Sequence, residues 1–200
     1  MPDLKNIYLY FLSLRKLIFK SIRELLFSTN FYNKLLISAI PSRFFFYPNP
    51  YLLSPLLNHK SFLFKISKND INNFWNENLK KNIHSFLWLN LIDRKNEAEI
   101  IQKIIRDWIS KYGNYKKDIW NDNIINKRII AWISNSEIIL NNVQKDFERI
   151  FFQSLIKQIN FIKKSLKIVS HEATKISSIS AIMLSGLVFK EYFNNYSANR

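Results

Sequence analysis

Two residues have types and positions suited to binding a charged, ring-shaped ligand. Trp120 lies in a polar stretch, 114–123, and Arg128 follows near the start of a predicted helix. An indole ring can stack on the face of a sugar, and a guanidinium can bind a carboxylate or sulfate through two hydrogen bonds. A structural role competes with this one, because Arg128 could instead pair with Asp107 or Asp122 and hold two helices together.

The three histidines offer little ground for a metal site. His59, His84 and His171 lie far apart and show neither HxH nor HExxH spacing. The chain has no cysteine, which excludes disulfides and cysteine metal sites. We therefore expect no metal and no other cofactor. His84 lies in a nearly all-apolar stretch, so it is open to two interpretations, a hydrogen-bonded core histidine or a substrate-binding one.

The composition indicates one folded, mainly helical domain. The chain has 200 residues, of which 48% are hydrophobic and 22% charged, as in ordinary globular proteins. Only two glycines and five prolines occur, too few for the many turns of an all-β protein. We expect an all-α fold.

The formal net charge of +15 would attract an anionic polymer. The enrichment of Lys, Asn, Ile and Phe over Ala, Gly and Pro has a second explanation, because an AT-rich genome produces the same bias. The cations are scattered along the chain and match no nucleic-acid-binding motif, so nucleic-acid binding ranks last among the functions considered.

The apolar spacing predicts five helices in the second part of the chain, because apolar residues recur at steps of three and four. Gly113 is placed to end one of them, and Ser177 or Ser178 could cap the start of the last. Helices joined by short loops suggest stacked helical hairpins. The predicted helices are 78–92, 97–112, 124–140, 144–166 and 177–193.

Residues 1–40 form a basic, amphipathic N-terminal region. Over 4–27, apolar residues recur with a helical period, and four cations are placed on the opposite side: Arg15, Lys16, Lys20 and Arg23. Such a helix can pack on its own domain or lie on an anionic membrane surface. No apolar stretch is long enough to span a membrane, and no secretory signal is evident, so a cytoplasmic and a periplasmic location both stay open.

Residues 41–70 interrupt the helical pattern. Four prolines break an aromatic stretch and exclude a continuous helix there. We expect an irregular segment that packs on the domain, with a short strand at 62–66. The prolines are Pro41, Pro48, Pro50 and Pro55.

Four short motifs, taken in order, resemble the N-terminal helical part of the heparinase II/III-like family of polysaccharide lyases, especially its bacterial branch. The resemblance covers roughly residues 40–193. The motifs are Ile83-His84-Ser85-Phe86-Leu87-Trp88-Leu89, Asp107-Trp108-Ile109, Trp120 with Arg128-Ile129-Ile130-Ala131-Trp132, and Ser154-Leu155-Ile156-Lys157-Gln158.

The resemblance implies an incomplete α/α toroid followed by a β-sandwich. Residues 71–200 would then be about the first half of the toroid. We expect the chain to be a gene fragment, or a short form of the family, whose partner is the C-terminal toroid and β-sandwich portion.

The resemblance also implies cleavage of acidic, uronate-containing polysaccharides by β-elimination. Many family members use an Asn-His pair at the start of the helix that corresponds to 177–193 to neutralise the uronate carboxylate. Residues 171–178 contain no such pair, so no catalytic residue is carried over, and the chain alone is expected to be inactive. Trp120, Arg128 and His84 are the candidate substrate-binding residues, and Trp88, Trp108 and Trp132 are predicted core residues. The alternative is a noncatalytic helical module that binds glycan or the cell envelope.

Overall fold

A computed structural model describes residues 4–37, 43–49, 74–77, 81–92, 98–166, 169 and 171–189. Every regular element in these ranges is a helix, which confirms the all-α class. His59 and the strand predicted at 62–66 lie outside the described residues.

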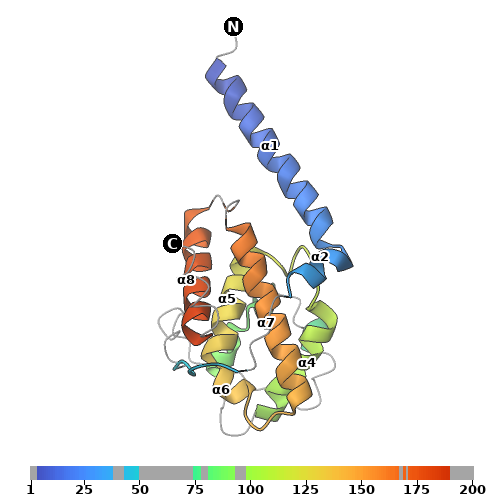
Figure 1. The fold of residues 1–200 in the computed structure, drawn as a ribbon, viewed down its shortest axis with the longest axis vertical. Helices are drawn as coiled ribbons and strands as arrows, with labels where there is room; N and C mark the ends of the chain where they lie inside the picture. The colour runs from blue at the N-terminus through green and yellow to red at the C-terminus, as the bar shows by residue number, and fades with distance from the viewer. Residues whose placement is uncertain are drawn as a thin grey trace.

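The body of the molecule is built around α5 (Asp122–Ser134). This helix packs against α7 (Lys145–Ser165) and α8 (Glu172–Val188), and α4 (Ala98–Tyr112) packs on α7 (Figure 1). Nine of the 13 residues of α5 are buried, as expected of a helix that contacts neighbours on several sides. The described body also contains the short helices α2 (Asn30–Leu35), α3 (Phe74–Glu77) and α6 (Ser136–Ile139), and two 3₁₀ helices within 81–91.

Two of the predicted body helices occur nearly as expected, because each has a continuous apolar stripe. Helix α4 matches the prediction for 97–112 and buries Ile101, Ile104 and Trp108. Helix α7 matches the prediction for 144–166, with Phe151 and Leu155 fully buried. Long periodic stretches of this kind specify a helix through the burial of one face.

The prediction of a continuous helix at 78–92 is wrong. Two short 3₁₀ helices occur there, η3 (Lys81–Ser85) and η4 (Leu87–Leu91), separated by Phe86 with a φ of 58°. A left-handed phenylalanine is unfavourable by itself. Its ring is fully buried and lies 5.3 Å from the ring of Trp132 and 5.8 Å from that of Trp108. Core packing therefore outweighs helical propensity at this position.

The helix predicted at 124–140 is interrupted at Asn135, where α5 ends and α6 begins. The buried Asn135 amide donates from Nδ2 to the carbonyl of Ala131 at 2.8 Å and to Oδ1 of Asn90 at 2.7 Å. A side chain that bonds the backbone in this way competes with continuation of the helix.

The last helix also differs from its prediction at 177–193. Helix α8 begins at Glu172, after His171 at the N-cap position, and ends at Val188. Ser178 is therefore not a cap. It lies inside α8, where its hydroxyl donates to the Thr174 carbonyl at 2.9 Å and accepts a hydrogen bond from Nδ2 of Asn126 at 2.8 Å. This second bond ties α5 to α8.

Gly113 follows the last residue of α4, as predicted. Its N–H donates to the Ile109 carbonyl at 2.9 Å. The glycine is not in a left-handed conformation. A Cβ added there would collide with the carbonyl oxygen of Ile109, so close backbone approach is the reason that this position suits glycine.

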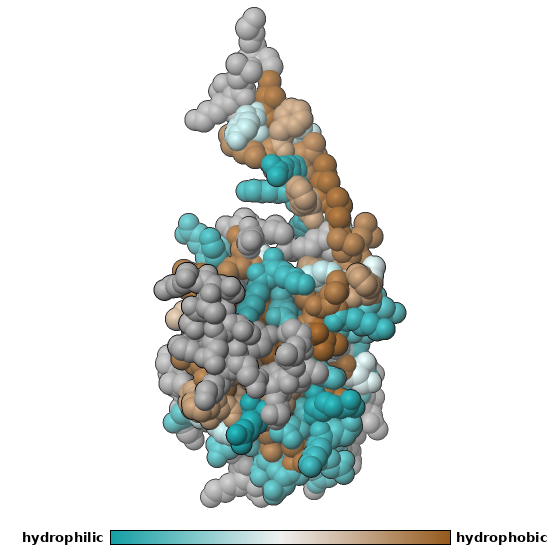
Figure 2. All heavy atoms as spheres, in the orientation of Figure 1, coloured by the Kyte–Doolittle hydropathy of each residue, from teal (hydrophilic) through white to brown (hydrophobic). Residues whose placement is uncertain are grey.

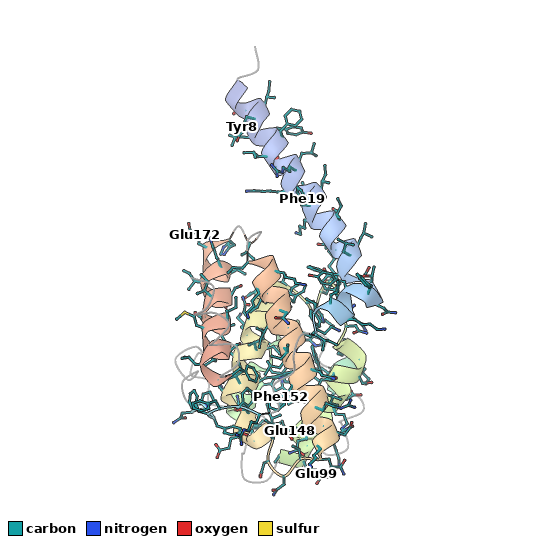
Figure 3. All side chains as sticks on the ribbon, viewed as in Figure 1. Tyr8, Phe19, Glu99, Glu148, Phe152 and Glu172 are labelled. Atoms are coloured by element: carbon teal, nitrogen blue, oxygen red, sulfur yellow. The ribbon has the colours of Figure 1, made fainter. Side chains whose placement is uncertain are left out.

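The described part of the Pro-rich segment, 43–49, forms neither helix nor strand. Phe44 is buried, with its ring 5.1 Å from that of Phe152 and 4.8 Å from that of Phe189. The N–H of Phe45 donates to the Val188 carbonyl at 2.8 Å. This stretch therefore covers the end of α8. Figure 3 labels Phe152 of α7, one of the residues that Phe44 contacts.

Helix α1 (Leu4–Phe27) has the predicted bounds 4–27. Figure 1 shows it projecting from the described helices of the body, with its C-terminal end against them. There Phe27 is buried against Tyr32, Tyr115 and Phe161, and Glu24 forms an ion pair with Lys117 at 2.9 Å. Among the described residues, the contacts of the helix with its domain given above lie in its last turn. Among the described helices, none combines the length and apolar character needed to cross a membrane.

Candidate functional site

The motifs identified in the sequence meet in a group of side chains around Arg128, which we call the arginine cluster: the half-buried His84 and the buried Trp108, Arg128 and Gln158. Arg128 Nε donates to Gln158 Oε1 at 2.5 Å, and Nη1 donates to the His84 carbonyl at 2.9 Å. The guanidinium carbon lies 4.2 Å from the ring centroid of Trp108. The cluster therefore joins η3, α4, α5 and α7.

Arg128 is fully buried, and its hydrogen bonds end on neutral oxygens, including the Ile119 carbonyl at 3.4 Å. Burial lowers the pKa of this guanidinium, since a buried charge loses its hydration. The face of Trp108 compensates in part through a cation–π contact.

The alternative that paired Arg128 with Asp107 or Asp122 is wrong. Asp107 pairs with Lys111 at 2.8 Å, and Asp122 accepts a hydrogen bond from the Ser165 hydroxyl at 2.6 Å. Arg128 does hold helices together, but through carbonyl and amide oxygens. It also lies in the second turn of α5, because the helix begins earlier than predicted.

His84 is a neutral hydrogen-bond acceptor in this arrangement. Its Nδ1 accepts from Nε1 of Trp108 at 3.1 Å, so the neutral ring carries its proton on Nε2. The pKa of His84 is lowered to about 4, first by burial and then by the positive charges of Arg128 and Lys116. The ring can therefore donate from Nε2 without bearing a charge at neutral pH.

His84 is half-buried, and it also belongs to a second group, the His84 edge: His84, Tyr112 and Lys116. The rings of His84 and Tyr112 lie 5.0 Å apart, and Lys116 Nζ lies 4.7 Å from the Tyr112 ring centroid. The buried Trp75 ring stacks on His84, at 5.3 Å between ring centroids and an interplanar angle of 10°. Because Tyr112 is partly exposed and Lys116 is exposed, this edge combines aromatic surface with positive charge.

Trp120 is not at the surface. Its side chain is 2% exposed, its Nε1 donates to the Tyr112 carbonyl at 2.9 Å, and its ring lies 5.4 Å from that of Phe161. The expectation that a tryptophan in a polar loop offers an open face is wrong, because the loop folds the indole into the core. Neither Trp120 nor Arg128 has a surface free for a ligand here, and a substrate-binding role for them stays a prediction that this geometry does not favour.

Lys157 is a buried cation that the sequence reasoning missed. It is 5% exposed, and its Nζ donates to the Gly113 carbonyl at 2.8 Å and to Asn114 Oδ1 at 2.6 Å. Burial lowers its pKa to about 8. Lys157 lies off the apolar stripe of α7, so the apolar periodicity does not predict its burial. Gln158 lies on that stripe, three residues after Leu155 and four before Ile162.

His171 is exposed at the start of α8, and its side chain makes no capping hydrogen bond. Within the described ranges, no three His, Asp or Glu side chains gather closely enough to hold a metal ion. The fold and the two side-chain groups thus define a helical domain with an arginine cluster and a basic, aromatic edge. Comparisons with protein-family models, with curated proteins and with solved structures gave no match.

Proposed function

We propose that this chain is the N-terminal helical portion of a heparinase II/III-like polysaccharide lyase that acts on acidic, uronate-containing polymers. In this proposal the helical body belongs to an incomplete α/α toroid. The residues of the chain supply the framework of the substrate groove. No residue described above is assigned as the base that removes the uronate proton.

The observation that carries the proposal is the meeting of the motifs at one place. His84, Trp108, Arg128 and Gln158 come from four motifs that lie between residues 83 and 158, and all four side chains belong to the arginine cluster. Each motif by itself is short. Direct contact gives a physical reason for these residue types to occur together, because a change in one would leave a partner without its hydrogen bond.

The His84 edge is the part of this region that is suited to an acidic sugar. The Nε2–H of a neutral His84 can donate to a carboxylate, and Lys116 adds a positive charge. The Tyr112 ring offers an aromatic surface between them. Within the predicted substrate-binding set, His84 is therefore the residue that this geometry favours.

The test of lyase activity is product formation by the full-length gene product. Incubation with alginate or heparan sulfate should release unsaturated uronates, which absorb in the ultraviolet, whereas neutral dextran should give none. If the folded protein releases no unsaturated product from acidic polymers, the lyase proposal fails.

Substrate contact at the His84 edge can be tested separately by binding. The Lys116→Ala variant should weaken binding of heparan sulfate by about two- to fivefold, the usual range for one exposed charge. Lys145, an exposed lysine on α7, provides the matched control as Lys145→Ala. Equal effects of the two substitutions would remove the edge from the proposal.

A noncatalytic glycan-binding module is the second candidate. It is favoured by residues 171–178, which lack the Asn-His pair of the family. Binding that depends on Lys116 without any unsaturated product would support this candidate over the lyase.

A further inference from the structure

Helix α1 exposes an unusual amount of apolar surface. Twelve of its large apolar side chains are between 38% and 70% exposed. In Figure 3 the labelled Tyr8 and Phe19 extend from the part of α1 that stands clear of the body. The twelve are Ile7, Tyr8, Leu9, Tyr10, Phe11, Leu14, Leu17, Ile18, Phe19, Ile22, Leu25 and Leu26.

The charges of α1 are almost all positive and are concentrated on one side. Successive residues turn by roughly 100° around a helix, which brings the positions of Lys16, Lys20 and Arg23 together. Figure 2 shows apolar residues running along α1 on one side and hydrophilic residues on the other. Glu24 is the one acidic residue of α1, and it is engaged by Lys117.

Arg15 departs from the predicted pattern. It was expected opposite the apolar face, but its guanidinium carbon lies 5.5 Å from the ring centroid of Phe19, so the side chain lies on the apolar side. A long arginine can keep its stem on apolar surface while its head reaches a charged layer. This placement suits a helix at a boundary between apolar and charged material.

We infer that α1 is a docking helix for the surface of a bilayer that contains anionic phospholipids. Its length is about 36 Å, but its cations exclude burial across the apolar interior, so it would lie in the plane of the interface. Its apolar residues enter the acyl boundary, and Lys16 and Lys20 face the negatively charged headgroups. The formal net charge of +15 favours approach to the same surface.

The width of the apolar face argues against a second copy of the chain as the occupant. A two-helix seam uses a narrow stripe of two positions per heptad. Here the exposed apolar residues include neighbours such as Leu17, Ile18 and Phe19, which point in different directions around the helix. A partner helix would cover only part of this face, whereas lipid can cover all of it.

Flotation of the purified full chain with vesicles tests the inference. We expect binding to equimolar phosphatidylcholine and phosphatidylglycerol, and weak binding to phosphatidylcholine alone. The double variant Lys16→Gln/Lys20→Gln should lower the partition coefficient about 30-fold, from about 1 kcal/mol per cation near an anionic surface. The matched control removes two exposed body lysines, Lys145→Gln/Lys175→Gln, and should change binding much less.

The apolar contribution is tested by Ile18→Asp, which should lower partitioning by about tenfold or more. Met183 on α8 is also exposed, at 65%, so Met183→Asp is the control and should bind like the unaltered chain. Circular dichroism establishes that each variant is folded. Absence of binding by the folded chain, or equal loss in the α1 and control variants, overturns the inference. A dimer in sedimentation that Ile18→Asp dissociates, without vesicle binding, assigns the face to a second copy instead.

Discussion

Arg128 is a buried cation, and neutral hydrogen-bond acceptors and the face of an aromatic ring stabilise its charge. Replacement by Ala leaves Gln158 Oε1 and the His84 carbonyl unpaired and opens a cavity beside Trp108. We expect Arg128→Ala to lower the free energy of unfolding by about 3–5 kcal/mol, measured by urea denaturation. If this variant does not fold, Arg128→Lys should show a loss of about 1–3 kcal/mol, because it keeps the charge but not the planar set of donors.

Arg106 is the matched control for that substitution. Its side chain is 46% exposed and lies 3.5 Å from Asp146. Arg106→Ala should therefore cost less than about 1 kcal/mol. Similar losses for Arg106 and Arg128 would contradict the view that the arginine cluster holds the helices together.

His84 makes the stability of the protein depend on pH in acid. Its pKa falls from 6.5 to about 4 on folding, so the unfolded chain binds the proton more tightly. Above pH 6.5 His84 is neutral in both states and does not reduce the free energy of unfolding. As the pH falls toward 4, the unfolded chain takes up the proton first, and the free energy of unfolding decreases. With allowance for its partial exposure, we expect a loss of about 1–2 kcal/mol.

Carboxylates also titrate in part of this pH range. The contribution of His84 is therefore obtained by comparing the pH dependence of the free energy of unfolding in the unaltered protein and in the variant His84→Gln. In His84→Gln the amide oxygen can still accept from Trp108, but it does not titrate. Urea denaturation from neutral to acid pH should show a smaller decrease for the variant. Parallel decreases would show that His84 is not the responsible group.

At the scale of elements, the predicted helices succeeded where one apolar stripe dominates and failed where single side chains interrupt the backbone. The Phe86 ring and the Asn135 amide act through partners distant in sequence, Trp132 and Asn90 among them. The candidate site likewise depends on contacts between residues that are distant in the sequence. His84 and Arg128 were both selected from the sequence, but their contact across 44 positions and the burial of Trp120 depend on how the helices fold together, which local spacing does not encode.

The left-handed Phe86 gives a prediction specific to the break between η3 and η4. Both Phe86→Ala and Phe86→Gly lose the buried ring, at a cost of about 3–5 kcal/mol. Glycine adopts a φ of 58° without the steric penalty that alanine suffers, so Phe86→Gly should be the more stable of the two by about 1 kcal/mol. Chemical denaturation of the two variants measures this difference.

The opposite order is expected at an ordinary helical position. Lys103 is exposed within α4, where glycine is less favourable than alanine by about 1 kcal/mol. Lys103→Gly should therefore be less stable than Lys103→Ala. The same order at both positions would mean that residue 86 does not hold the left-handed conformation in solution.

For the whole molecule, the body and α1 should behave as separable parts joined at Phe27. Removal of residues 1–20 takes away exposed helix and leaves Phe27 and the ion pair between Glu24 and Lys117 in place. We expect the free energy of unfolding of the body to change by less than about 0.5 kcal/mol.

Phe27→Ala, which removes a ring that is 2% exposed from its contacts with Tyr115 and Phe161, should instead lower the free energy of unfolding by about 3–5 kcal/mol. Thermal and urea denaturation of the two proteins distinguish these effects. A large loss of stability on removal of residues 1–20 would mean that the exposed face of α1 packs on the body in solution, and it would leave no free apolar face for a membrane.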